Sequence, residues 1–333
     1  MSKWKIILGI VLVASFILMI VVFFLAQKTI PQTVQYGMSF NTMYATELGL
    51  DWRETYDALL DDLGVKHLRL AAHWPMVEPK LGEYNFTELD YQINRAAEVG
   101  ADVILGVGRR LPRWPECHEP DWVKNKSSTE VQKAQLAYME QVIKRYKDNP
   151  AIVYWQVENE PFLEVFAFDH CGELDTDFLD QEIALVKSLD PERPVLITDS
   201  GNLGLWYKAY KKGDLFGTSV YVHFWNPEIG QFRTVLPPFV YRVKENILAL
   251  IYGRKPTMLI ELSAEPWLIA PVPSVPLEVQ FTRMDTEKFS DILAYAKQTR
   301  YDKQYLWGAE WWYWLSQQGH PEMWEMGKNL YHN

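Results

Sequence analysis

The feature that most constrains the fold is a regular alternation of short apolar stretches with longer amphipathic ones, beginning at residue 35. The short stretches have the length and near-continuous apolar character of strands buried on both faces, at residues 35–40, 67–71, 102–106, 152–157, 194–198, 217–222, 257–261 and 306–311. Helical spacing of apolar residues marks the stretches between them, at residues 52–63, 89–99, 129–148, 175–189, 203–211, 238–252 and 286–300. This alternation predicts an α/β fold, a closed (β/α)8 TIM barrel over residues 35–333.

The aromatic content and the net charge of the chain bear on which class of ligand it can bind. The chain has 14 Trp, 18 Tyr and 15 Phe. Trp and Tyr present large flat faces with a polar edge, onto which sugar rings stack, although most aromatic residues in any chain belong to its core. The formal net charge of −10 is opposite to the basic surface that a nucleic-acid partner requires. We therefore expect no nucleic-acid partner.

The N-terminal segment differs from the rest of the chain. Residues 6–26 (IILGIVLVASFILMIVVFFLA) are uncharged and mostly apolar, and at about 1.5 Å per residue they span a bilayer core of roughly 30 Å. Lys3 and Lys5 precede them, which favours a cytoplasmic N-terminus at residues 1–5. The long apolar stretch ends in FFLAQKT, a poor cleavage site, so a retained transmembrane signal anchor is favoured over a cleaved signal peptide.

This anchor predicts a single-pass protein of the cell membrane. A linker at residues 27–34 would join it to the barrel on the outside, and cleavage would instead release a secreted protein. Export also bears on the two cysteines, because disulfides form in oxidising compartments. Cys117 and Cys171 follow the third and fourth strands. Adjacent strands bring those two loops to the same face of a barrel, which favours a disulfide over two unpaired cysteines.

Polar residues gather where the predicted strands end. In barrels of this kind the reactive groups lie at the carboxyl ends of the strands. The residues at these ends are His73 and Trp74, Arg109 and Arg110, the run Glu158, Asn159, Glu160 and Pro161, then His223, Glu261 and the run Trp311, Trp312, Tyr313 and Trp314. A random scatter of polar residues would not follow strand polarity in this way.

Two of these residues are glutamates on opposite sides of the predicted mouth. Glu160 ends the fourth strand and Glu261 ends the seventh. Two carboxyl groups that reach inward across a barrel mouth can come within about 5–5.5 Å, the spacing used for glycosidic bond cleavage with retention of configuration. One group protonates the leaving oxygen and the other attacks the anomeric carbon.

Several motifs around these glutamates resemble those of clan A glycoside hydrolases. Residues 155–161 (WQVENEP) are similar to the Asn-Glu-Pro motif that ends strand four in the clan, and residues 255–261 (KPTMLIE) to its strand-seven segment. Residues 73–86 (HWPMVEPKLGEYNF) resemble a stretch of families 42 and 5, and residues 308–314 (GAEWWYW) resemble the strand-eight motif. Taken together in this order, the motifs cover most of the exported chain.

The resemblance implies roles for individual residues. Glu160 would be the acid/base and Glu261 the nucleophile of a retaining glycoside hydrolase. Asn159 would hold the 2-hydroxyl of the reacting sugar, and Arg69 would support the nucleophile. Further substrate-binding positions are expected at His73, Trp74, Tyr221, His223 and Trp312. Either Tyr221 or His223 could contact the nucleophile, and the sequence does not decide between them.

The nucleophile and the activity each have a competing interpretation. Glu265 follows the seventh strand closely enough to be a rival nucleophile, although Glu261 ends the apolar strand directly. The same two glutamates could serve a transglycosylase, and the same barrel could be a membrane-anchored protein that binds glycans without cleaving them. No His-Glu-x-x-His spacing or glycine-rich phosphate loop is present. We therefore expect no metal and no cofactor, and an oligosaccharide or polysaccharide as substrate.

Overall fold

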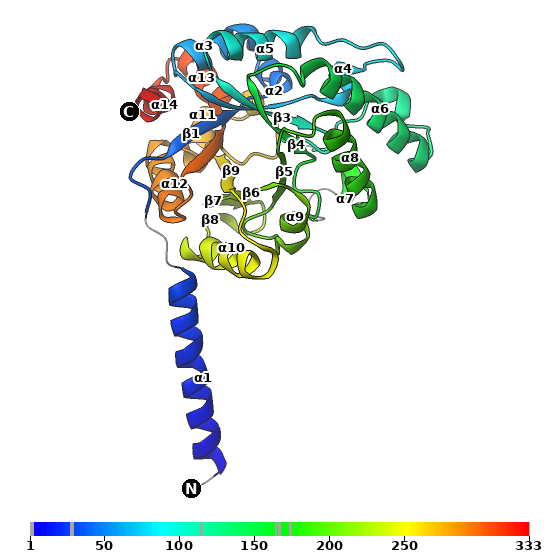
Figure 1. The fold of residues 1–333 in the computed structure, drawn as a ribbon. Coiled ribbons are helices and arrows are strands. Elements are labelled where there is room, and N and C mark those ends of the chain that lie inside the picture. Colours follow the sequence, from blue (N-terminus) through cyan, green and yellow to red (C-terminus); the bar gives the residue numbers. More distant parts are fainter. Residues whose placement is uncertain are drawn as a thin grey trace.

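The protein is a closed barrel of eight parallel strands surrounded by helices, with one long helix standing apart from it (Figure 1). A computed structural model describes residues 3–26, 30–113, 116–163, 165, 168–172 and 175–332. Around the barrel the strands follow the order β1-β10-β9-β6-β5-β4-β3-β2, and every neighbouring pair is parallel. The barrel predicted from the alternation is thereby confirmed.

The observed strands match the predicted ones closely, with one exception. They are β1 (Gln35–Ser39), β2 (His67–Ala71), β3 (Asp102–Val107), β4 (Ile152–Val157), β5 (Val195–Asp199), β6 (Leu215–Val220), β9 (Thr257–Ser263) and β10 (Lys303–Trp307). The exception is the last strand, predicted at residues 306–311. It ends earlier because Gly308, at φ 121°, turns the chain and the Trp-rich run that follows forms a helix.

Helices cover the outside of the barrel, and each strand is followed by at least one. They are α2 (Thr42–Glu47), α3 (Trp52–Asp61), α4 (Trp74–Val77), α5 (Thr87–Glu98), α6 (Ser128–Tyr146), α7 (Phe168–Cys171), α8 (Thr176–Leu189), α9 (Tyr207–Lys212), α10 (Phe239–Tyr252), α11 (Leu277–Arg283), α12 (Thr286–Gln298), α13 (Ala309–Gln317) and α14 (Glu322–His332). Short 3₁₀ turns lie at Asp121–Val123 and Val272–Ser274. The last two helices, α13 and α14, follow β10, and no helix was predicted after the last strand.

The barrel interior is apolar at one end and polar at the other. Side chains that fill its apolar end form a buried cluster of Ile104, Leu196, Leu215, Met258, Ile260 and Tyr305. Further along the strands the interior holds Arg69 and Gln156, both buried. Polar groups inside a barrel are costly unless they are paired, so the polar end is the candidate location of a functional site.

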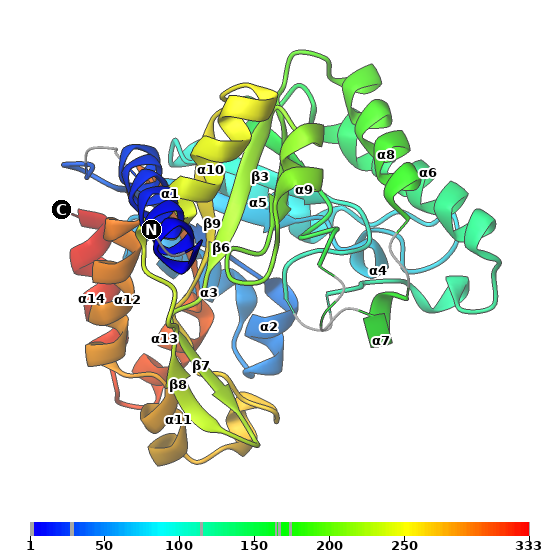
Figure 2. The same cartoon turned by 90° about the horizontal axis from the view of Figure 1, so that it is seen from below.

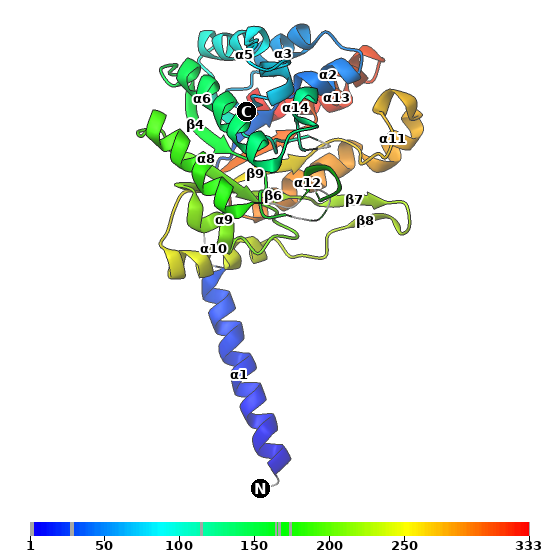
Figure 3. The ribbon, with the colours of Figure 1, turned by 90° about the vertical axis from the view of Figure 1, so that its right-hand side faces the viewer.

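Two segments project from the barrel. A hairpin of β7 (His223–Asn226) and β8 (Gly230–Arg233) follows β6 and extends beyond the barrel body (Figure 2). Helix α1 (Lys3–Leu25) leaves the barrel beside α10, and it stands crosswise to the barrel strands (Figures 2 and 3). Among the described residues α1 is the one helix long and apolar enough to cross a membrane, and its most apolar window is not buried at all.

Candidate active site

Glu261 is held by two hydrogen-bond donors at the carboxyl end of β9. Nη1 of Arg69, from β2, lies 2.8 Å from Oε1 of Glu261. The hydroxyl of Tyr221, which follows β6, donates to Oε2 at 2.7 Å. Arg69 and Glu261 are both buried, so their charges attract each other with little screening by solvent. This setting holds the Glu261 carboxylate in one position beside a positive charge.

A β-bulge in β9 directs Glu261 toward the barrel interior. On one side Thr218 pairs with Leu259 and Ser219 pairs with Glu261, so Ile260 is an extra residue on β9. The pairing with β10 shifts over the same stretch. Side chains of a regular strand alternate between the two faces, whereas a bulge puts two successive side chains on one face. Ile260 and Glu261 can therefore both point inward.

Glu160 lies just beyond β4 in a backbone conformation that its neighbours maintain. Its φ is 45°, in the left-handed region that side-chain-bearing residues rarely adopt. The backbone N–H of Glu160 donates to Oγ1 of Thr198 at 2.8 Å, and its carbonyl accepts from the N–H of Leu163 at 2.9 Å. Such conformations persist where the surrounding structure fixes them, and they concentrate at functional sites.

The carboxyl group of Glu160 is buried and favours its protonated form. Burial raises the pKa of Glu160 well above its usual value, and the negative charges of Glu261 and Glu116 raise it further. The hydroxyl of Ser219 donates to Oε1 of Glu160 at 2.8 Å and works in the opposite direction. The site thus contains one carboxyl group biased toward the neutral form beside one that is paired with an arginine.

Arg69 also connects the two glutamates through Asn159. Its Nη2 donates to Oδ1 of Asn159 at 2.7 Å, and its Nε donates to Oε1 of Gln156 at 2.8 Å. A planar guanidinium has five donors in a rigid geometry. Here one guanidinium fixes the Glu261 carboxylate, the Asn159 amide and the Gln156 amide relative to one another.

A third carboxylate near the pair was not predicted from the sequence. Glu116, in the loop after β3, accepts from Nε and Nη2 of Arg110 at 2.9 and 2.8 Å. Burial raises the pKa of Glu116 and Arg110 lowers it, while the charge of Glu261 raises it again. Ser219 was missed as well, although it lies close to the end of β6. The strand-end rule could have found Ser219, whereas the path of a loop cannot be inferred from its residues.

Glu265 lies in a different environment from Glu261. Its Oε1 is 2.8 Å from Nη2 of Arg113, and the Arg113 guanidinium lies over the ring of Tyr44, 3.1 Å from its centre. Burial raises the pKa of Glu265 and Arg113 lowers it. By contrast, the negative charges that raise the pKa of Glu160 are those of Glu261 and Glu116. Glu265 is thus the partner of Arg113 at the β1–β9–β10 side of the mouth.

Two tryptophans that were expected to bind substrate, Trp74 and Trp312, lie in the protein core. Trp74 and Trp312 are fully buried. Trp74 donates to Glu78, and Trp312 donates to the Ala264 carbonyl. These two tryptophans are core residues, which corrects the expectation that they contact a substrate.

The two histidines have other partners as well. His223 pairs with Asp291 at 2.9 Å and connects the β7–β8 hairpin to α12, so Tyr221 and not His223 contacts Glu261. His73 is buried against His118, with ring centres 4.4 Å apart. Burial lowers the pKa of His73 well below its usual value, and His118 lowers it further.

Trp307, and not Trp312, lies at the end of the last strand. It ends β10, and its ring lies near Tyr221 (6.3 Å between centres) and Arg113 (5.4 Å). The indole nitrogens of Trp307 and Trp267 are buried without a hydrogen-bond partner among the described residues. An unpaired buried donor costs about 1–3 kcal/mol, so these two indole nitrogens are exceptions to the usual pairing of buried polar groups.

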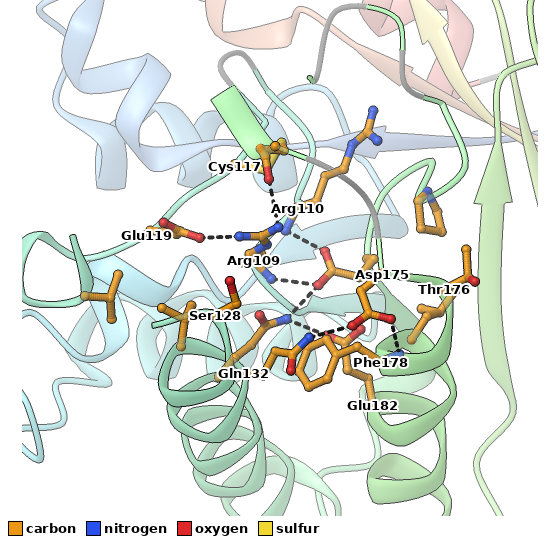
Figure 4. Close-up of a pocket in the computed structure, with 18 of the residues that line it drawn as sticks. Arg109, Arg110, Cys117, Glu119, Ser128, Gln132, Asp175, Thr176, Phe178 and Glu182 are labelled. Carbon is orange, nitrogen blue, oxygen red and sulfur yellow. Dashed lines mark hydrogen bonds and ion pairs between the residues drawn. A yellow bond between two sulfur atoms is a disulfide. The ribbon is translucent and has the colours of Figure 1, made fainter. Parts of the chain in front are cut away.

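The neighbouring β3 and β4 loops are joined by a disulfide. Cys117 and Cys171 are bonded, with their Cα atoms 5.4 Å apart. Beneath them is a cavity of about 430 Å³ lined by residues such as Arg109, Gln132 and Glu182 (Figure 4). Glu158 accepts there from the N–H of Arg109 at 3.0 Å and from Gln135 at 2.7 Å. Glu158 therefore braces the loop after β3. No group of three or more His, Cys, Asp or Glu side chains suited to a metal ion occurs in the described part of the chain.

Comparisons with known proteins agree on glycoside hydrolases. A family model described as cellulase (glycosyl hydrolase family 5) matches residues 31–226. A β-galactosidase, LacA, from Lactobacillus acidophilus is 27% identical over 104 residues, which is 26% of this chain and 16% of LacA. A probable mannan endo-1,4-β-mannosidase F from Emericella nidulans is 30% identical over 134 residues, 36% of this chain and 28% of the relative.

Solved structures show the same fold. A β-galactosidase from Rahnella sp. R3 superposes with a TM-score of 0.58 at 15% identity, over 85% of this chain and 51% of that one. At this identity the superposition bears on the fold alone. The chain spans between about one sixth and about half of the length of these three proteins.

Proposed function

The chain belongs to glycosyl hydrolase family 5, and on this premise we propose that it hydrolyses β-glycosidic bonds with retention of configuration. Glu261 is the nucleophile and Glu160 is the acid/base. The observation that carries the proposal is the difference between the two carboxyl groups. Glu261 accepts from Arg69 and Tyr221, whereas burial and the charge of Glu261 raise the pKa of Glu160 well above its usual value. One ionised and one protonated carboxyl group are what a double displacement requires.

In the first step a carboxylate oxygen of Glu261 attacks the anomeric carbon, and the bond from that carbon to the leaving oxygen breaks. The proton of Glu160 moves to the leaving oxygen, so the first product departs as an alcohol. A glycosyl ester on Glu261 remains, and Glu160 is now a carboxylate. Loss of the negative charge on Glu261 lowers the pKa of Glu160, because that charge is one of the causes that raise it. Glu160 is thus prepared to act as a base.

In the second step Glu160 takes a proton from water, and the water oxygen attacks the anomeric carbon. The ester bond to Glu261 breaks, and the Glu261 carboxylate is regenerated beside Arg69. Two inversions at the same carbon give net retention. At the end of the cycle Glu160 is protonated again and ready for the next substrate.

Substrate contacts follow from the same geometry. Arg69 occupies Oδ1 of Asn159, so the amide nitrogen is the group that Asn159 can offer to a sugar hydroxyl. The unpaired donors of Trp267 and Trp307 would bind further hydroxyls, and the Trp307 ring would stack on a sugar face. The names of the relatives, β-galactosidase and β-mannosidase, support a β-linked substrate.

We also propose that α1 anchors the barrel to the outer face of a membrane. The helix has 23 residues, about 35 Å at 1.5 Å per residue, enough to cross a hydrocarbon core of roughly 30 Å. Lys3 and Lys5 precede the apolar stretch and favour an inside N-terminus. The barrel and its glycan substrate would then be outside the cell.

The test uses aryl β-glycosides and β-linked polysaccharides as substrates. Glu160→Gln and Glu261→Gln should each lower kcat by at least about 1,000-fold, while circular dichroism remains that of the parent. The sugar product should first appear as the β-anomer in proton NMR. Full activity of either variant, or an α-anomer as first product, would refute the proposed mechanism.

A further inference from the structure

Helix α10 has an unusual distribution of polar and apolar side chains. A helix on the outside of a soluble barrel normally buries its apolar stripe and exposes its polar one. In α10 the polar residues Arg242 and Glu245 are buried and paired with each other. The apolar residues Ile247, Leu250 and Ile251 are exposed, Leu250 by 78% and Ile251 by 62%. These three lie at i, i+3 and i+4 and form one stripe on the outer face.

This apolar stripe lies next to the end of α1. Nδ2 of Asn246, on α10, donates to the carbonyl of Leu25, the last residue of α1. Nη1 of Arg300 donates to the carbonyl of Ala26 at 2.6 Å. Leu250 and Ile251 are only about one helical turn beyond Asn246, or roughly 6–8 Å along the axis. Leu250 and Ile251 therefore lie near the C-terminal end of α1.

The orientation of α10 suits a planar apolar phase. Figures 1 and 3 show α10 lying crosswise to α1 along the edge of the barrel from which α1 emerges. A helix that lies in a bilayer interface buries its apolar face about 5–10 Å below the headgroups. Basic residues flank the stripe: Arg254 is exposed, and Nζ of Lys211 lies 5.6 Å from the centre of the Tyr252 ring. Such residues favour anionic lipid headgroups.

We propose that the outer face of α10, formed by Ile247, Leu250 and Ile251, docks onto the bilayer that α1 crosses. This inference rests on the proposed membrane span of α1 and not on the hydrolase activity. The bilayer is the partner of this stripe because the stripe lies beside the end of α1, the helix that is proposed to cross the bilayer. In the docked orientation the barrel strands run along the membrane plane, because they lie crosswise to α1 (Figure 2). The barrel mouth then opens along the membrane surface.

The experiment measures how deeply single positions of the full-length chain lie in a membrane. Three variants, Val13→Cys, Leu250→Cys and Leu81→Cys, are labelled with the fluorophore NBD without reduction of the native disulfide. They are reconstituted into vesicles of phosphatidylcholine and phosphatidylglycerol. Leu81 is the matched control because it is an exposed leucine (64%) in the segment between α4 and α5. These two helices lie on the opposite side of the barrel from α1 (Figure 1). Spin-labelled lipids quench from the bilayer and iodide quenches from water.

Docking predicts that spin-labelled lipids quench the labels at positions 13 and 250 at least twofold more than the label at position 81, and that iodide shows the opposite order. If position 250 behaves like position 81 while position 13 is quenched by lipid, docking is wrong and the anchor stands. Shielding of position 250 from both quenchers would mean that protein, such as a second copy of the chain, covers α10, which also overturns the inference. Quenching of position 13 by iodide would overturn the anchor together with the docking. None of these outcomes depends on hydrolase activity.

Discussion

The guanidinium of Arg69 lies 2.8 Å from the carboxylate of Glu261, and neither group is exposed to more than a tenth of its surface. Removing one partner of a buried ion pair leaves an uncompensated charge, at a cost of about 3–5 kcal/mol. Without Arg69 the Glu261 carboxylate would lose its charge partner and one of the two groups that hold it in position. The pair is therefore central to the proposed chemistry.

Arg69→Met should lower kcat by at least about 100-fold, because the Glu261 carboxylate would lose its charge partner. Steady-state kinetics on an aryl β-glycoside measure the effect, and thermal unfolding verifies that the variant is folded. Arg109→Met is the matched control, since Arg109 pairs with Glu119 away from the two glutamates. Equal losses of kcat in the two variants would show that Arg69 has no special role.

Tyr221→Phe should lower kcat by about 10- to 100-fold, because it removes one hydrogen bond to the Glu261 carboxylate and leaves the ring in place. His223→Ala provides the comparison. It breaks the pair with Asp291 at the hairpin and should change kcat less than threefold. A larger kcat effect for His223→Ala than for Tyr221→Phe would reverse the assignment.

Azide distinguishes Glu261 from Glu265 and from Glu160. In Glu261→Ala, azide should restore turnover of an activated aryl β-glycoside and give the α-glycosyl azide, because it attacks directly in place of the missing nucleophile. In Glu160→Ala it should attack the glycosyl-enzyme and give the β-glycosyl azide. Glu265→Ala removes the partner of Arg113, so we expect a raised KM and no glycosyl azide. An α-azide from Glu265→Ala would identify Glu265 as the nucleophile.

Glu310 should make stability depend on pH. Burial raises its pKa from 4.5 to about 7, so the folded chain holds this proton over a pH range in which the unfolded chain releases it. The stabilisation from this group is complete below about pH 4.5 and is lost as the pH rises through 7, a change of about 3 kcal/mol.

Glu310→Gln removes this titration and still offers an oxygen to the Asn41 N–H, which donates to Oε1 of Glu310. We therefore expect the free energy of unfolding of the variant, relative to that of the parent, to increase by up to about 3 kcal/mol between pH 5 and pH 8. Urea unfolding of both proteins at the two pH values measures it. Parallel pH profiles for the two proteins would contradict this prediction.

The disulfide should stabilise the loops beside the site. Cys117 and Cys171 are 54 residues apart, and closing a loop of this length in the unfolded chain contributes about 4 kcal/mol in the chain-entropy model. The double variant Cys117→Ala, Cys171→Ala should lose up to that amount of unfolding free energy in urea titrations. An unchanged midpoint in non-reducing buffer would show that the bridge adds nothing to stability.

Much of the fold was predictable because a parallel barrel requires strands that are apolar on both faces. The short apolar stretches marked the strands, and polar residues at their ends placed Glu160 and Glu261 at one end of the barrel. The run from Trp311 to Trp314 was misassigned because a short apolar run has no clear period. It follows Gly308, and the chain turns there into helix α13. Trp312 therefore lies in the core, and Trp307 lies at the mouth.

Other features depend on contacts between distant segments. The bulge at Ile260 is defined by its pairing with β6 and β10, and no residue pattern within β9 reveals it. Glu116 reaches the site through a loop whose path is set by Arg110 and by the disulfide. Tyr221 and His223 were equivalent in the sequence, and contacts with distant residues separate them: Tyr221 donates to Glu261, whereas His223 pairs with Asp291.

The most direct test of the central claim is to trap the glycosyl-enzyme intermediate. An activated 2-deoxy-2-fluoro-β-glycoside should inactivate the enzyme, since the fluorine slows both steps and the good leaving group allows the first. Peptide mass spectrometry should then find the fluorosugar esterified to Glu261, and Glu261→Gln should remain unlabelled. A label on Glu265, or inactivation without any labelled carboxylate, would contradict the assignment of Glu261 as the nucleophile.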